Sequence, residues 1–227
     1  YRVPTGFWAQ VLPGVRRVHP EMLTVAEILH GDYAAIAQAA GFDSVTQYEL
    51  WKAIWSTLAD RNPHELVWTL ERHDPLRGAL LPWTFVSNHD VTRIASQVGL
   101  KGARVATAAL MTIPGMPAIY YGDELGATGV KEERIGGDDA IRPALPEQPA
   151  LLSGESAETY RLAQLSIQIR RTHPWLVDGA CGVTQWDDQR LTWRTTGSDG
   201  QWVESMLTVG SEPSVRISDA TGELLVV

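Results

Sequence analysis

The chain has 227 residues, 44% of them hydrophobic and 20% charged, and its formal net charge is -8. This composition is typical of a globular protein, and the acidic excess argues against a nucleic-acid partner, because nucleic acids are bound through clustered Lys and Arg. Cys181 is the only cysteine, which excludes an intrachain disulfide and predicts a buried, unreactive thiol. No apolar run reaches about eighteen residues, so no membrane association is expected.

Short apolar runs alternate with helical stretches through the first 175 residues. The apolar spacing predicts helices over residues 4–19, 33–40, 49–59, 63–73 and 101–113, and a last helix that starts near Ser156 as its N-cap and ends before Pro174. Strands are predicted around residues 23–27 and 41–45 and in the apolar segments 85–86 and 116–120. This alternation indicates β-α units and a parallel sheet.

Polar residues follow the apolar segments at the points where the predicted strands end. Leu23-Thr24-Val25-Ala26 runs into Glu27, and Phe85-Val86 runs into Ser87-Asn88-His89-Asp90. Side chains at the carboxyl ends of parallel strands line the mouth of a barrel, where active sites form. The Gly-, Pro- and acid-rich stretch 126–154 is predicted to be a long loop on the same side.

The sequence pattern changes from about residue 176. Short alternating runs over 191–195, 203–209 and 223–227 are separated by Gly, Asp and Ser, which predicts a small antiparallel sheet. We therefore expect two domains, residues 1–175 and a β-sandwich-like domain over residues 176–227.

Two segments together resemble a known family. Phe85-Val86-Ser87-Asn88-His89-Asp90 and Gly115-Met116-Pro117-Ala118-Ile119-Tyr120-Tyr121-Gly122-Asp123-Glu124 resemble the seventh- and eighth-strand segments of the alpha-amylase family of retaining glycoside hydrolases and transglycosidases. Residues 23–27, with His30-Gly31-Asp32 after them, resemble its fifth-strand segment. The resemblance implies an α/β fold: the second half of a (β/α)8 TIM barrel, strands five to eight, followed by the all-β domain.

The resemblance also implies roles for individual residues. Glu27 corresponds to the proton donor, and its neighbours Leu23, Val25 and Ala26 are expected to desolvate it and favour its protonated form. Asp90 would be a catalytic carboxylate that binds and distorts the reacting sugar ring, and His89 would hydrogen-bond the same ring. Judged by residue pattern alone, Glu27 could equally cap a helix, and the Asn-His-Asp triplet could be a turn with an Asx-type cap.

Other residues carry weaker signals. Arg2 stands where the family often has a Lys-His pair that contacts the leaving-side sugar, which implies a substrate-binding role. Residues 138–143 resemble an Asp-x-x-Arg-Pro stretch of members that act on short glucosides, although a solvated loop is the simpler interpretation. The acids of Gly122-Asp123-Glu124 are expected to fix the loop rather than catalyse, and Trp83 is expected in the core.

The resemblance places the nucleophilic aspartate roughly three residues before Tyr1, upstream of this chain and with the first four strands. We therefore expect part of an enzyme that hydrolyses or transfers alpha-glucosidic bonds in an alpha-glucoside or oligosaccharide with retention. The missing amino-terminal half would be its partner, and unpaired strand edges predict self-association. The alternative is a catalytically inactive amylase-like binding or accessory subunit. No cofactor is predicted, although calcium is possible in the full-length protein, and a cytoplasmic location is the default expectation.

Overall fold

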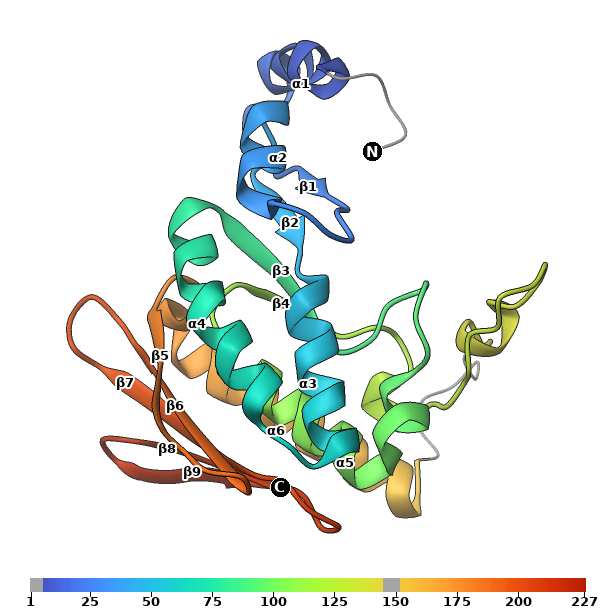
Figure 1. Ribbon diagram of the computed structural model, residues 1–227, viewed down its shortest axis with the longest axis vertical. Coiled ribbons are helices and arrows are strands. Elements are labelled where there is room, and N and C mark those ends of the chain that lie inside the picture. Colours follow the sequence, from blue (N-terminus) through green and yellow to red (C-terminus); the bar gives the residue numbers. More distant parts are fainter. Residues whose placement is uncertain (1–5, 145–151) are drawn as a thin grey trace.

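A four-stranded parallel sheet forms the first part of the fold (Figure 1). The computed structural model describes residues 6–144 and 152–227. Within them the strands lie in chain order and pair only with their neighbours. The strands are β1 (Val25–Ala26), β2 (Ser44–Thr46), β3 (Leu81–Phe85) and β4 (Met116–Ala118). Their carboxyl ends therefore meet along one edge, as the sequence predicts.

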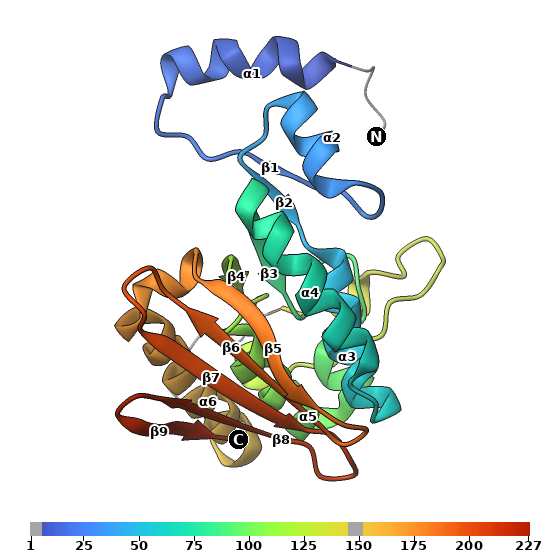
Figure 2. The same ribbon diagram turned by 60° about the vertical axis from the view of Figure 1, so that its left-hand side comes forward.

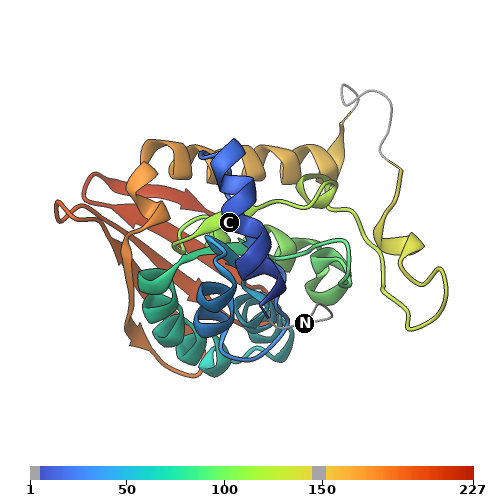
Figure 3. The same cartoon turned by 90° about the horizontal axis from the view of Figure 1, so that it is seen from above.

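Helices precede, connect and follow these strands and cover one face of the sheet. They are α1 (Phe7–Val18), α2 (Tyr33–Ala40), α3 (Tyr48–Asp60), α4 (His64–Ala79), α5 (Ile94–Leu110) and α6 (Gly154–Thr172), with short 3-10 turns η1 (Asp123–Leu125), η2 (Asp139–Ile141) and η4 (Pro174–Val177). Figure 2 shows α1 lying across one end of the molecule, and Figure 3 shows α6 lying beside the carboxyl-terminal sheet. Within the described residues, no helix is both long and apolar enough to cross a bilayer.

The remaining strands form one antiparallel sheet in which each strand pairs with the next. They are β5 (Ala180–Trp186), β6 (Arg190–Thr196), β7 (Trp202–Thr208), β8 (Ser214–Asp219) and β9 (Gly222–Val226). The expected all-β element is therefore present, but it is not sandwich-like. A single sheet packs on helices, as Figure 2 shows, so helices provide the second layer.

The main hydrophobic core lies between these helices and the antiparallel sheet. Leu50, Leu70 and Leu110 from α3, α4 and α5 belong to the same buried cluster as Trp193 and Ile217 from the sheet. Alternation along β6 and β7 puts every second side chain into this layer. Cys181 is buried there, as expected, and burial raises the pKa of its thiol to about 12.

Several predicted helix ends are wrong by a few residues. α4 extends six residues beyond the predicted end at His73. α5 begins at Ile94 rather than at residue 101, and its axis is interrupted at Gly99, which has φ 72° and ψ 169°. Ser153, not Ser156, occupies the N-cap position of α6.

Candidate active site

Polar side chains from three strand ends are joined by hydrogen bonds at the sheet edge. Glu27 directly follows β1, Tyr48 begins α3 just after β2, and Asn88 follows β3. The Tyr48 hydroxyl donates to Glu27 Oε1 at 3.0 Å and accepts from Asn88 Nδ2 at 2.8 Å. Tyr48 therefore links the predicted proton donor to the Asn-His-Asp segment.

Tyr48 itself is held firmly. It is 7% exposed, and its ring makes edge-to-face contacts with Phe85 and Trp51, at centroid distances of 5.1 and 5.9 Å. Burial raises the pKa of the Tyr48 phenol, the hydrogen bond from Asn88 lowers it, and the nearby Glu27 carboxyl raises it further. The phenol consequently remains protonated and available as a donor at neutral pH.

The Asn-His-Asp segment folds into a compact turn. Asn88 Oδ1 accepts from the backbone N–H of Asp90 at 2.9 Å, which is the Asx-type cap that the pattern also allowed. His89 Nε2 lies 3.4 Å from Asp90 Oδ2, and both side chains remain partly exposed. The turn and the functional interpretation are compatible, because the cap leaves His89 and Asp90 accessible.

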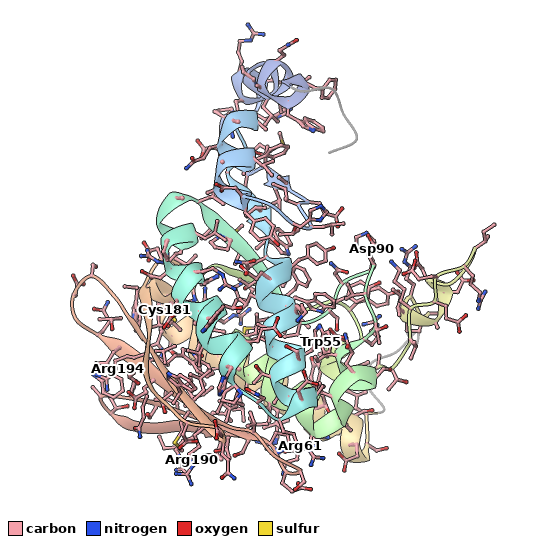
Figure 4. The ribbon with its side chains drawn as sticks, in the orientation of Figure 1. Trp55, Arg61, Asp90, Cys181, Arg190 and Arg194 are labelled. Atoms are coloured by element: carbon pink, nitrogen blue, oxygen red, sulfur yellow. The ribbon has the colours of Figure 1, made fainter. Side chains whose placement is uncertain are left out.

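Arg142 closes this region from the long loop after β4. Its guanidinium lies 3.1 Å from Asp90 Oδ1 and 2.9 Å from Asp138 Oδ2, and it donates to the carbonyl of His89 at 3.0 Å. The stretch remains largely exposed to solvent, as the simpler interpretation expected, and Arg142 in addition pairs with Asp90. Figure 4 labels Asp90 in the loop after β3, on the side of the molecule where residues 127–144 lie.

A second arginine organises the loop that follows β4. The fully buried Arg93 donates to the Tyr121 carbonyl at 2.6 Å and to the Ile141 carbonyl at 2.9 Å, and pairs with Asp123 at 2.9 Å. Glu124 accepts from the Gly122 N–H at 2.8 Å. The expectation that these acids fix the loop is confirmed.

Two neighbouring pockets open at this edge. One, of about 460 Å³, is lined by Glu27, His89 and Trp83 among others, and the second, of about 750 Å³, by Tyr48 and Asp90 among others. Both volumes fall in the range of small-molecule sites. Trp83 was expected in the core, but its side chain faces this pocket and is 37% exposed, because alternation along β3 turns it away from the helices.

Among the residues that the structure describes, no group provides the expected desolvation of Glu27. Glu27 is exposed, and so is Leu23, while only Ala26 of the strand is buried, on the opposite face. Arg2 lies outside the described residues. Over residues 6–144 and 152–227, no group of three or more His, Cys, Asp or Glu side chains is placed to hold a metal ion.

Glu27 and His89 line one pocket, and Asp90 lines the next. Two further residues that the sequence did not point to also contribute to the site. Tyr48 and Arg93 lie outside the segments that resemble the family. Tyr48 could have been found by the strand-end rule, since it follows β2 by only two residues. Arg93 has no such signal, because its contacts come from residues about thirty and fifty positions away.

Comparison with known proteins gives consistent matches. A family model described as the alpha amylase catalytic domain matches residues 4–192. Neopullulanase 2 of Thermoactinomyces vulgaris is 30% identical over 158 residues, which are 64% of this chain and 25% of that protein. Cyclomaltodextrinase of Geobacillus thermopakistaniensis is 26% identical over 235 residues, covering 97% of this chain and 37% of that protein. The chain thus spans well under half of these relatives.

Solved structures agree on the fold. The cyclic alpha-maltosyl-(1→6)-maltose hydrolase of Arthrobacter globiformis, in complex with maltose, superposes with a TM-score of 0.75 at 18% identity, over 99% of this chain and 53% of that one. At this identity the likeness concerns the fold alone.

Proposed function

Because the chain belongs to the alpha-amylase family, we propose that it supplies the proton-donor side of an active site that hydrolyses or transfers alpha-glucosidic bonds with retention. In this proposal β1 to β4 are the fifth to eighth strands of a (β/α)8 barrel, within a domain covering residues 1–175. The carboxylate that attacks the sugar comes from a part of the enzyme outside this chain.

One observation carries the proposal. A carboxyl at the end of β1, Glu27, is linked through Tyr48 to the Asn-His-Asp segment, which places His89 in the pocket of Glu27 and Asp90 in the neighbouring pocket. Two of the groups that acetal cleavage requires, a proton donor and hydrogen-bonding partners for the ring, therefore lie at one edge of the sheet.

The chemistry would proceed in two steps. In the first, the attacking carboxylate forms a bond to the anomeric carbon while the glycosidic C–O bond breaks, and Glu27 gives its proton to the leaving oxygen. In the second, Glu27, now ionised, takes a proton from water or from a sugar hydroxyl, whose oxygen displaces the carboxylate. Retention requires the two carboxyls to be about 5 to 5.5 Å apart. Asp90 and His89 would bind ring hydroxyls more strongly as the ring distorts, which lowers the barrier.

The names of the relatives support a substrate class. Their names describe enzymes acting on pullulan-type and cyclic maltodextrins, and the Arthrobacter enzyme was seen with maltose. We therefore propose alpha-linked gluco-oligosaccharides as substrates of this chain's enzyme. Arg2, in the segment before the described residues, is proposed to contact the leaving-side sugar.

A Glu27→Gln variant of the complete enzyme tests the assignment. Hydrolysis of maltotriose should fall by about 10²- to 10⁴-fold, because the leaving oxygen loses its proton donor. An aryl alpha-glucoside with an acidic phenol needs little protonation, so formation of the glycosyl-enzyme from it should fall far less. Glu21→Gln, which changes another exposed glutamate six residues away, is the matched control and should leave turnover unchanged.

Two outcomes would contradict the proposal. Wild-type turnover of maltotriose by the Glu27→Gln variant would remove Glu27 from its role. A wild-type protein that binds maltotriose but hydrolyses or transfers none of it would instead favour the inactive binding or accessory subunit.

A further inference from the structure

The contact between Tyr48 and Glu27 has a fixed direction. A backbone N–H can only donate, so the hydrogen bond from Asp90 N identifies the Asn88 side-chain atom it meets, at 2.9 Å, as the oxygen. The other Asn88 atom is then the amide nitrogen, which donates to the Tyr48 hydroxyl at 2.8 Å. The Tyr48 oxygen accepts this bond, which leaves its own proton for Glu27 at 3.0 Å. Four groups therefore form one chain of hydrogen bonds that ends on the carboxyl.

We propose that Tyr48 is a positioning residue, which holds the Glu27 carboxyl in one orientation and stabilises its ionised form by donating a hydrogen bond to it. The inference rests on the proposed function, in which Glu27 must be a carboxylate when it takes a proton from water. The burial of Tyr48 and its packing on Phe85 and Trp51 fix the donor in place. A fixed donor costs little reorganisation at the moment of reaction.

The effect on titration has a definite sign. A donor aimed at a carboxylate favours its charged form, so loss of the donor makes the proton harder to remove. The proton donor must be protonated in the first step, and its titration therefore sets the basic limb of the pH–rate profile. Removing the Tyr48 hydroxyl should move that limb toward higher pH.

Other groups that face Glu27 could influence the same titration. His89, after β3, and Tyr120, after β4, line the pocket with Glu27. Asp90 lies near Tyr48, and its charge is partly balanced by Arg142. None of these groups is altered by a Tyr48→Phe change, which removes one oxygen and keeps the ring. A shift in that variant therefore reports the Tyr48 hydroxyl.

The test uses two readouts on wild type and Tyr48→Phe. The first is the ¹³C titration of the Glu27 carboxyl, assigned by its loss in Glu27→Gln, which needs no turnover. Its midpoint should rise by roughly half a pH unit to one pH unit. The second is the basic limb of the kcat/KM profile on maltotriose, which should move by the same amount. Tyr160→Phe, on α6 and partly exposed, is the matched control and should change neither.

A double variant checks the direction of the chain of hydrogen bonds. Asn88→Ala removes the donor to Tyr48 and also the acceptor of the Asp90 N–H. The part of its effect on the Glu27 midpoint that is transmitted through Tyr48 should disappear in the double variant with Tyr48→Phe, whereas an effect that is fully retained there would show that Asn88 does not act through Tyr48. An unshifted midpoint in Tyr48→Phe would overturn this inference even if turnover were normal. Absence of turnover in the wild type would overturn the proposed function, while the carboxyl titration would still decide the role of Tyr48.

Discussion

At the residue scale, burial of charge shows which contacts hold the site together. The Arg93 guanidinium is fully buried and lies over the Tyr120 ring, 4.1 Å from its centroid. Burial raises the pKa of its partner Asp123 to about 6, while the hydrogen bond from Arg93 opposes the rise. Because Arg93 also holds the carbonyl of Ile141, it fixes the residue that precedes Arg142, which in turn contacts Asp90. Arg93 therefore supports the site without reaching the pocket.

A buried histidine gives the fold a predicted pH dependence. His73 donates from Nε2 to the Pro114 carbonyl at 2.9 Å, and burial lowers its pKa to about 4. An unfolded histidine binds a proton near pH 6.5, whereas folded His73 does not until about pH 4. The free energy of unfolding should therefore fall as pH drops through this window, by roughly 2 kcal/mol between about pH 7.5 and pH 5.

Urea unfolding of the wild type and of His73→Gln at the two pH values measures this contribution. The variant should lose about 2 kcal/mol less on acidification than the wild type, whatever its stability at neutral pH. His19→Gln removes an exposed histidine and should behave like the wild type. If wild type and His73→Gln lost the same free energy of unfolding on acidification, the pKa of His73 would not be lowered in the folded state.

Residues at strand ends were predictable, and residues held by distant partners were not. Glu27 directly follows one apolar strand and His89 comes four residues after another, so the pattern locates both at the carboxyl ends of the strands without a structure. The exposure of Glu27 was missed because desolvation depends on neighbouring elements rather than on the strand's own side chains. The contacts of Arg142 were missed because a loop of Gly, Asp and Arg gives no periodic signal.

At the element scale, the observed helix ends differ from those predicted by apolar spacing, because tertiary contacts help to determine where a helix begins. The first turn of α5, from Ile94, lies before the break at Gly99. Its first N–H is satisfied by the Ser87 hydroxyl at 2.9 Å, which comes from the preceding strand end rather than from a local cap. A boundary set by such a contact is invisible to apolar spacing.

Gly115 determines how closely β4 approaches β3. Its φ is +109°, and a Cβ there would lie 2.6 Å from the Pro82 carbonyl oxygen. A Gly115→Ala change therefore combines an unfavourable backbone conformation with a clash against backbone that cannot rotate away. We expect the free energy of unfolding to fall by about 2–4 kcal/mol, measured by urea unfolding.

The matched control for this change is Gly78→Ala in α4. A Cβ at Gly78 would meet no atom within 4 Å, and its φ lies in the ordinary range. Alanine is the better helix former, so this variant should be as stable as the wild type or up to about 1 kcal/mol more stable. Equal stability of Gly115→Ala and Gly78→Ala would show that the approach of β4 to β3 is not limited by Gly115.

At the scale of the whole molecule, the antiparallel sheet and the helices share one core. The Thr195 hydroxyl donates to the Thr112 carbonyl, and the Ser205 hydroxyl to the Thr112 hydroxyl, each at 2.8 Å. These bonds lie among buried residues of α5 and the sheet. We therefore expect the predicted domains 1–175 and 176–227 to unfold together, because separating the sheet from the helices would expose the hydrophobic core that they share.

The parallel sheet, by contrast, has two open edges among the residues described. β1 pairs only with β2, and β4 only with β3. Large apolar side chains are exposed close to the β1 edge, including Phe7, Trp8 and Val11 on α1 and Leu23 just before β1. Unpaired strand edges and exposed apolar side chains both favour association.

We therefore predict that the 227-residue chain, produced alone, forms dimers or larger species rather than a 25.0 kDa monomer. Light scattering after size-exclusion chromatography measures the mass directly. Val25→Lys puts a charge on the β1 edge strand, where pairing with another strand would bury it, so this variant should shift the population toward the monomer. Val130→Lys, which charges an exposed valine in the loop after β4, should leave the mass distribution as in the wild type. A stable, monodisperse 25.0 kDa species in the unmodified chain would mean that the edges are protected in solution, and would remove the physical reason for expecting a partner along β1.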